Sequence, residues 1–306
     1  MSAPIREIRL DVGGVSISGL LSEPSDATGV RALVVALHGL GMHAGYFHGT
    51  AAPGLSLLEL GARLGFVVWA PDRPGVGSSS DLPDAEVTLY SQARLVLDAI
   101  DVFASRYAPT AGVFLVGHSY GTKLVLAMAA ESRGRELLGL DLSSCGLHYA
   151  FDWSAARSSI ERRARPGEAG SSWGPAALYP PGTFSREVLP LHPNRDAQVE
   201  EGGRWTDDFV NFAPEVQVPV RMTFAEHERL WRTDDQELSE IRALLSETPR
   251  LVVDIQASAG HNISLGWTAR AYHLKALAFA EECIAMRLQS ASPRDRRESR
   301  KPYRNL

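Results

Sequence analysis

The sequence of 306 residues has little cysteine, no long apolar run and no excess of positive charge. Its two cysteines, Cys145 and Cys283, lack the spacing of a metal site, and we expect no disulfide framework. No stretch reaches the ~18 consecutive apolar residues that a bilayer-spanning helix needs, and MSAPIREIRLDVGG has no signal-peptide core. The net charge of -5 argues against a nucleic-acid-binding protein. We therefore expect a cytoplasmic protein with no nucleic-acid or membrane partner.

What the sequence does contain is an alternation of apolar strands and amphipathic helices. Two antiparallel strands, IREIRLDV and VSISGLLSEP, are predicted around Gly13-Gly14. Further strands are predicted at ALVVALHG, FVVWAPD, VFLV, LLGLDLSS, VPVRMTFA and RLVVDIQA. Helices are predicted near residues 88–107, 122–132, 235–246 and 267–287, and residues 46–64 are expected to be partly helical. Such alternation indicates an α/β fold with a mostly parallel central sheet flanked by helices on both faces. Ligands bind such sheets at the carboxyl ends of the strands.

The stretch from Val113 to Ala130, VFLVGHSYGTKLVLAMAA, passes from an apolar strand into an apolar helix. Between them stands G-H-S-Y-G, which fits the G-x-S-x-G pattern of a nucleophile elbow. Side chains two residues before and two after the serine would collide with this turn, which suits Gly117 and Gly121. The hydroxyl of Ser119 would then project at a helix N-terminus, where negative charge is favoured. The pattern predicts Ser119 as a nucleophile.

A serine nucleophile needs a base, and the base needs an orienting acid. His261, in AGHN, lies just after the last predicted strand, where the chain order serine, acid, histidine places the base. The acid is expected after VPVRMTFA, where Glu228 is the preferred candidate. Glu226 and Asp141 remain alternatives for the acid.

An attacked carbonyl develops negative charge on its oxygen, and two N–H donors must be aimed at it. One donor is predicted to be the amide of Tyr120, directly after the nucleophile. The other is expected in HGLGMHAGYF, where Gly39 lets the backbone approach closely and Leu40 is the preferred donor, with Gly41 as the alternative.

Three histidines of this loop, His38, His43 and His48, are close in sequence, but the chain offers no matching set of metal ligands. We expect them to pack and to form hydrogen bonds within the loop. The sequence predicts neither a metal nor a cofactor. His118 and Met42, beside the expected nucleophile and oxyanion donors, are candidate substrate contacts.

Residues 148–215 interrupt the alternation with a proline-containing, aromatic-rich segment that has no clear strand. We interpret it as an inserted, mainly helical cap over the active-site edge, with residues 1–147 and 216–290 as the core and 291–306 as a disordered tail. We expect some of its aromatic side chains to line an apolar substrate pocket, and the alternative is that most of them form the cap's own core. The candidate substrate contacts among them are Trp153, Trp173, Trp205 and Phe209.

The motifs HGLGMH, APDRPGVGSS, GHSYG and AGHN, with the acid after VPVRMTFA, together resemble the α/β-hydrolase fold over about residues 5–288. By this resemblance, Asp72 and Arg73 shape a turn. Glu228 is preferred as the acid because related enzymes carry a small residue and then the acid at this place. Glutamate replaces the more common aspartate, a change that the family tolerates.

The resemblance implies a serine hydrolase acting on a small-molecule ester or thioester, in which Ser119 attacks, His261 transfers the proton and Glu228 orients the imidazole. The same residues could instead perform acyl transfer or elimination if the pocket excludes water. A non-catalytic ligand receptor on the same scaffold is the alternative from another class. A serine nucleophile argues against epoxide and haloalkane hydrolysis. A homodimer remains open.

Overall fold

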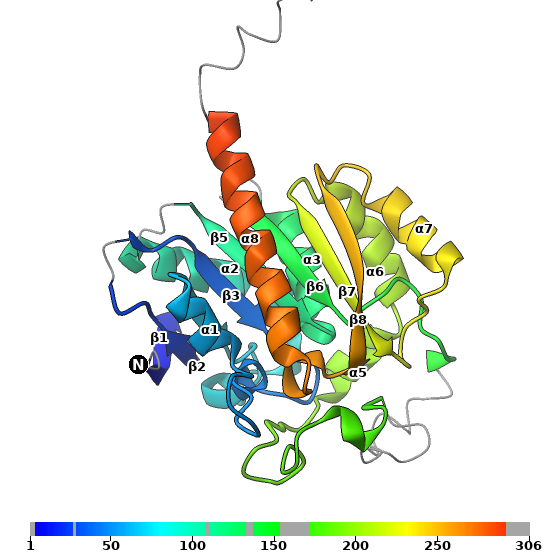
Figure 1. Cartoon of the computed structure of the whole chain (residues 1–306), viewed down its shortest axis with the longest axis horizontal. Helices are drawn as coiled ribbons and strands as arrows, with labels where there is room; N and C mark the ends of the chain where they lie inside the picture. The colour runs from blue at the N-terminus through cyan, green and yellow to red at the C-terminus, as the bar shows by residue number, and fades with distance from the viewer. Residues whose placement is uncertain (1–3, 27–28, 108–110, 133–136, 154–171, 292–306) are drawn as a thin grey trace, which may run out of the picture.

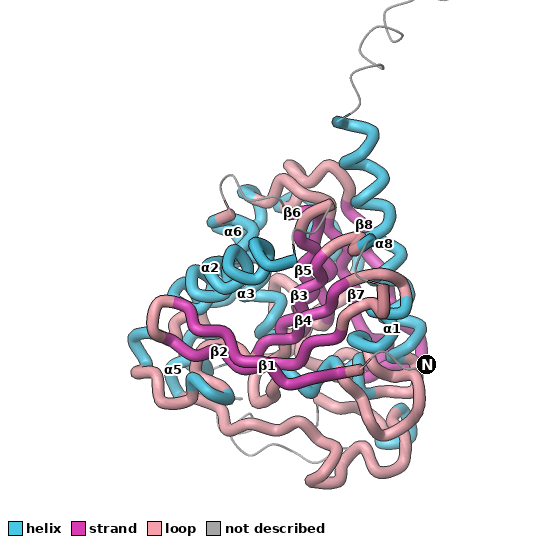
Figure 2. The backbone as a smooth tube through the Cα atoms, turned by 90° about the vertical axis from the view of Figure 1, so that its left-hand side faces the viewer, coloured by secondary structure: helices cyan, strands magenta, loops and turns pink. Residues whose placement is uncertain are grey.

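The computed structural model describes residues 4–26, 29–107, 111–132, 137–153 and 172–291. In this part of the chain, one eight-stranded sheet lies between two layers of helices (Figures 1 and 2). The prediction of an α/β fold with a mostly parallel sheet is confirmed. The expected tail at 292–306 and residues 154–171 of the expected cap lie outside the described residues.

The sheet has the strand order β1-β2-β4-β3-β5-β6-β7-β8. Strands β1 and β2 form an antiparallel hairpin, β2 pairs antiparallel with β4, and all later neighbours pair in parallel. The bounds are β1 (Ile5–Val12), β2 (Val15–Ser22), β3 (Leu33–Leu37), β4 (Val67–Pro71), β5 (Val113–His118), β6 (Leu137–Ser143), β7 (Val220–His227) and β8 (Leu251–Gly260).

Local sequence explains both kinds of strand. The hairpin turns at Gly13 and Gly14, whose φ angles of 59° and 87° are positive, as a tight two-residue hairpin turn requires. Every residue of β3, β4, β5 and β6 is buried, because helices cover both faces of these central strands. Their continuous apolar runs follow from that burial.

The helices form two layers, which Figure 2 shows on either side of the sheet. One layer holds α1 (Leu57–Arg63) and α8 (Ala269–Ala291). The other holds α2 (Leu89–Tyr107), α3 (Tyr120–Glu131), α6 (Trp205–Phe212) and α7 (Asp235–Leu244). The segment 46–64 is partly helical, as expected: a 3-10 turn ends at Phe47, and α1 begins after its N-cap, Ser56.

The chain between β6 and β7 carries α5 (Asp196–Gly202) and α6. Part of it, drawn in green, lies below the sheet in Figure 1. Helix α6 packs against α3, and its buried side chains belong to the same apolar core as those of α2 and α3. The cap boundaries, 148–215, stay a prediction. The end of that segment, helix α6, packs on α3 in the helix layer. No helix among the described residues is both long and apolar enough to cross a bilayer.

Candidate active site

Ser119 lies on the turn between β5 and α3, with φ 52° and ψ -117°. This left-handed backbone conformation is costly for a residue with a side chain and is found mainly where surrounding structure enforces it. A Cβ atom on Gly121 would lie 2.0 Å from the Leu37 carbonyl oxygen, and one on Gly117 would lie 2.7 Å from Thr122 Cα. Both glycines are therefore required, as the motif indicates. Ser119 keeps part of its surface exposed between two buried neighbours.

The structure brings three predicted side chains together in one hydrogen-bonded chain. His261 Nε2 lies 3.1 Å from Ser119 Oγ. His261 Nδ1 lies 3.0 Å and 3.1 Å from the two carboxylate oxygens of Glu228. In this order, Nδ1–H can donate to the carboxylate while Nε2 accepts the serine proton.

Glu228 is held as an anion in a buried place. Its side chain is 1% exposed, and Oε1 accepts hydrogen bonds from the N–H groups of Arg229 and Leu230. Burial alone would raise the pKa of Glu228, but the His261 charge and these N–H donors outweigh it, so the pKa is lowered. The carboxylate can therefore stabilise an imidazolium beside it.

Neither alternative acid reaches His261. Glu226 is exposed, and its carboxylate accepts a hydrogen bond from the Ser258 N–H. Asp141 is buried inside the sheet, where it accepts from Arg221 at 2.7 Å and from the Tyr272 hydroxyl at 2.7 Å. Asp141 therefore joins neighbouring strands and α8 instead.

The two expected oxyanion donors lie on either side of Ser119. Tyr120 is the first residue of α3, and the first N–H groups of a helix have no acceptor within the helix. A Cβ on Gly39 would lie 3.1 Å from Ser119 Cβ, so the loop carrying Leu40 passes against the serine. Leu40 is partly exposed, while the alternative donor Gly41 is buried.

The side chain of His118 is buried behind this turn. It stacks on Tyr46 with ring centroids 4.4 Å apart, and its Nδ1 lies 3.3 Å from Ser143 Oγ. Burial, with the His261 charge, lowers its pKa well below the usual range. Met42 is also buried, and it forms an isolated bridge with Leu191.

The loop histidines form local hydrogen bonds. His38 Nε2 accepts from the Arg73 N–H, and His43 Nδ1 accepts from the Gly45 N–H. His48 Nδ1 lies 3.0 Å from Ser56 Oγ.

The four aromatic candidates divide into two groups. Trp205 and Phe209 have no exposed surface and pack into the core, where Trp205 Nε1 donates to the Gly146 carbonyl. Trp153 and Trp173 are partly exposed. Trp173 packs edge-on against Tyr179 and Phe184. For Trp205 and Phe209, the structure therefore shows a packing role, which agrees with the alternative considered from the sequence.

Sequence reasoning did not identify the surroundings of Lys123, one helical turn after Ser119. Its buried ammonium lies 4.9–5.8 Å from the ring centroids of Tyr149, Trp153, Trp205 and Trp231. It donates one hydrogen bond, 2.6 Å long, to the Tyr149 hydroxyl. Burial lowers the pKa of Lys123 to about 8. A lysine inside an apolar helix was the only available signal.

Sequence reasoning also did not identify Glu201 of α5. Its Oε2 accepts from the Tyr120 hydroxyl at 2.8 Å, and its Oε1 accepts from the Leu89 N–H at the start of α2. Arg73 lies over the Tyr120 ring and donates to the Gly39 carbonyl. Through Glu201, helix α5 is hydrogen-bonded to Tyr120, the residue after Ser119. Through Arg73, Tyr120 is in turn linked to the Gly39 loop that passes against Ser119.

Ser144, directly after β6, is a third residue that was not identified. Its hydroxyl donates to the His261 carbonyl at 2.9 Å, and its φ of 50° is positive. It therefore fixes the backbone beneath the imidazole.

Comparison with solved structures shows the same fold. A carboxyl esterase from Bacillus coagulans superposes with a TM-score of 0.67 at 16% identity, over 93% of this chain and 99% of that one. A monoglyceride lipase from Saccharomyces cerevisiae gives 0.66 at 14% identity, over 92% and 95%. The thioesterase domain from the curacin biosynthetic pathway gives 0.57 at 17% identity, over 92% and 99%.

Sequence comparison adds a family assignment to this likeness of fold. No curated protein matches the chain. A family model described as the alpha/beta hydrolase family matches residues 34–282. That match covers most of the chain and includes the turn of Ser119 as well as Glu228 and His261. The chain belongs to the alpha/beta hydrolase family.

Proposed function

We propose that this protein is a serine hydrolase that cleaves a carboxylic ester or thioester of a bulky, largely apolar small molecule. The observation that carries the proposal is the hydrogen-bonded chain from Ser119 Oγ through His261 to Glu228. Serine at its ordinary pKa is a weak nucleophile, and this arrangement supplies the base and the orienting acid that it needs.

In the proposed mechanism, Ser119 Oγ attacks the carbonyl carbon while His261 Nε2 takes the hydroxyl proton. The amides of Tyr120 and Leu40 stabilise the oxyanion. His261 then gives the proton to the leaving alcohol or thiol, which leaves an acyl group on Ser119. Water, deprotonated by His261, attacks the acyl-enzyme and releases the acid. Glu228 remains ionised throughout and stabilises the charged imidazole.

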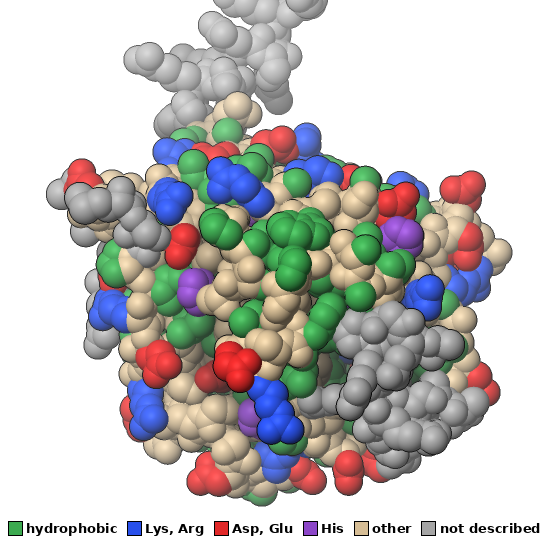
Figure 3. Space-filling model, turned by 60° about the horizontal axis from the view of Figure 1, so that its bottom comes forward, with side chains coloured by type: hydrophobic (Ala, Val, Ile, Leu, Met, Phe, Trp, Pro, Cys, Tyr) green, Lys and Arg blue, Asp and Glu red, His purple; other side chains and the backbone are tan. Residues whose placement is uncertain are grey.

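The nature of the substrate is inferred from the surroundings of Ser119. Hydrophobic side chains gather near the centre of the face turned forward in Figure 3. The partly exposed Trp173 and its neighbour Phe184 belong to the chain segment between β6 and β7. Pockets for small molecules are mostly apolar with a few placed polar groups, which favours an apolar acyl or alcohol portion. Esterases, a lipase and a thioesterase share this fold, which is consistent with ester or thioester chemistry.

The test combines turnover and active-site labelling. Wild-type protein should hydrolyse p-nitrophenyl esters or acyl thioesters and should react with a fluorophosphonate probe. Ser119→Ala should lose labelling and reduce kcat by several orders of magnitude, because losing the nucleophile removes the covalent route. Ser80→Ala, at an exposed serine, is the matched control and should behave as wild type.

Each other outcome has a defined meaning. Full activity in Ser119→Ala would reject the mechanism. Labelling at Ser119 with ester products in water–alcohol mixtures would favour acyl transfer. A folded wild-type protein that binds ligands but is neither labelled nor active would favour a receptor.

A further inference from the structure

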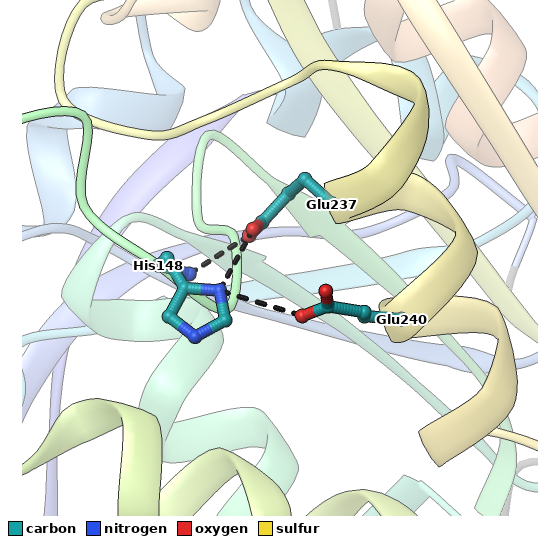
Figure 4. A group of neighbouring side chains, drawn as sticks. All are labelled: His148, Glu237 and Glu240. Atoms are coloured by element: carbon teal, nitrogen blue, oxygen red, sulfur yellow. Dashed lines mark hydrogen bonds and ion pairs between the residues drawn. The ribbon is translucent and has the colours of Figure 1, made fainter.

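A group of three side chains lies apart from Ser119, where helix α7 meets the chain that follows β6. Glu237 and Glu240 stand one turn apart on α7, and His148 comes from the facing segment (Figure 4). One oxygen or nitrogen atom from each side chain lies within 4.8 Å of the other two. In Figure 4, the imidazole directs Nδ1 toward both carboxylates and Nε2 away from them.

The three side chains differ in how firmly they are held. Glu237 has no exposed side-chain surface, and its Oε1 accepts from the N–H groups of Leu147 and His148 at 2.9 Å and 2.8 Å. Its Oε2 lies 2.8 Å from His148 Nδ1. His148 and Glu240 are 37% and 42% exposed, and their Nδ1 and Oε2 atoms are 3.8 Å apart. One ligand position is therefore fixed, and the other two can adjust.

The local charge is incompletely neutralised. Across the described residues, neither Glu237 nor Glu240 forms an ion pair with a lysine or arginine, and His148 is the only ion-pair partner of both. Arg232, whose charge also acts on Glu237 and Glu240, donates two side-chain hydrogen bonds to the carboxylate of Asp234. Two carboxylates and one imidazole face one another without a permanent positive charge between them.

We propose that His148, Glu237 and Glu240 form a binding site for a divalent transition-metal ion of the Zn²⁺ class, with water completing the coordination. An imidazole nitrogen with two carboxylate oxygens suits Zn²⁺ better than Mg²⁺ or Ca²⁺, which prefer oxygen ligands alone. Ligands at about 2.1 Å in a tetrahedron lie roughly 3.4 Å apart, between the two nitrogen–oxygen separations of 2.8 Å and 3.8 Å observed here.

Binding requires a small change at the imidazole. The metal takes the place of the Nδ1 proton, and the ring carries its proton on Nε2, which faces away from the carboxylates. The partly exposed His148 and Glu240 side chains adjust so that the distances from Nδ1 to the two carboxylates, now 2.8 Å and 3.8 Å, become equal.

The position of the site suggests its structural effect. The segment containing His148 pairs with the segment after Glu228, through the Arg232 N–H to the His148 carbonyl and the Ala150 N–H to the Leu230 carbonyl. Leu230 in turn donates to Glu228. A metal ion would fasten α7 to this pair of segments and so stiffen the support of Glu228. The sequence predicted no metal, because the spacing of these three residues shows no ligand motif.

Titration calorimetry with ZnCl₂ on EDTA-treated, tag-free full-length protein tests the proposal, with the thermal midpoint measured in parallel. Wild type should bind one Zn²⁺ per chain and should melt at a higher temperature as Zn²⁺ is added. His148→Ala and Glu240→Gln should each raise Kd by roughly tenfold or more, because each loses a ligand. Asp235→Asn, at an exposed residue of the same helix, should bind as wild type does.

Absence of Zn²⁺ binding by wild type would overturn the proposal. So would unchanged affinity in His148→Ala, or Ca²⁺ binding with no response to Zn²⁺. None of these readouts uses catalysis, so failure here is separate from failure of the proposed hydrolase function.

Discussion

Lys123→Met tests how the protein tolerates an ammonium group enclosed by four aromatic rings. Methionine keeps the length and apolar character of the side chain and removes only the charge and its donors. The Tyr149 hydroxyl still donates to the Gly202 carbonyl at 3.1 Å, so the substitution leaves that group with a partner. The variant should therefore fold.

The magnitude follows from the pKa of Lys123, which is about 8 in the folded protein against an ordinary 10.5. Between these values the unfolded chain binds more protons than the folded one, so the free energy of unfolding rises with pH. For this group, the rise between pH 7 and pH 9 is about 1 kcal/mol. Below pH 8 the charged form carries the full cost of burial, which the rings and Tyr149 offset only in part.

Urea unfolding followed by tryptophan fluorescence at pH 7 and pH 9 provides the measurement, because three tryptophans surround the ammonium. Subtracting the variant from the wild type cancels every other titrating group. Between pH 7 and pH 9, the free energy of unfolding of the wild type should rise by roughly 1 kcal/mol relative to that of Lys123→Met. Parallel pH profiles, or a wild type that loses stability relative to the variant, would refute the assigned burial of the charge.

Glu228→Gln should lower kcat by roughly 1,000-fold or more in an ester-hydrolysis assay, because a neutral amide does not stabilise the charged imidazole. Gly121→Ala should lower the thermal midpoint, with a cost of roughly 1–3 kcal/mol, because its methyl group would meet the Leu37 carbonyl. Arg221→Met should cost about 3–5 kcal/mol in urea unfolding, because it leaves the buried Asp141 carboxylate without its cation.

One matched control and three outcomes test these predictions. Glu226→Gln, two residues before Glu228, should retain most of the activity, and equal losses in both variants would contradict the assignment of the acid. A thermal midpoint unchanged in Gly121→Ala would contradict the close approach of α3 to β3. An unfolding free energy of Arg221→Met equal to that of the wild type would contradict the pairing of the buried Asp141 with Arg221.

The central sheet was predictable because its signals are local. Short apolar runs such as ALVVAL, FVVWA and VFLV marked the buried central strands, and Gly13-Gly14 marked the hairpin. The fold prediction is confirmed by the observed strand order. The segment 46–64 was expected to be partly helical, and its helix α1 begins only at Leu57, after Pro53-Gly54 and the cap at Ser56.

The candidate site was predictable where chain order constrains it and not where long-range packing decides. The G-x-S-x-G motif between a strand and a helix selected Ser119, and the place directly after the last predicted strand selected His261. Choosing Glu228 over Glu226 depended on a loop whose pairing with β8 shifts register between Ala225 and His227, which no local pattern reports. In the structure, Glu228 lies at 3.0 Å and 3.1 Å from His261 Nδ1, while its catalytic role stays a prediction.

The aromatic residues show the opposite limit. The sequence does not distinguish a tryptophan that faces a ligand from one that faces the core, because composition does not indicate the orientation of a side chain. Trp205 is buried because α6 lies on α3, a contact between segments about eighty residues apart.

The bond between Glu201 and Tyr120 limits how this enzyme could be remodelled. Transplanting the segment between β6 and β7 from a relative would remove the carboxylate that accepts from both Tyr120, the residue after Ser119, and the first turn of α2. A chimera would therefore need an acceptor at that place, or a phenylalanine in place of the tyrosine. The segment between β6 and β7 and the turn of Ser119 are coupled through this hydrogen bond, so libraries that vary one should vary the other with it.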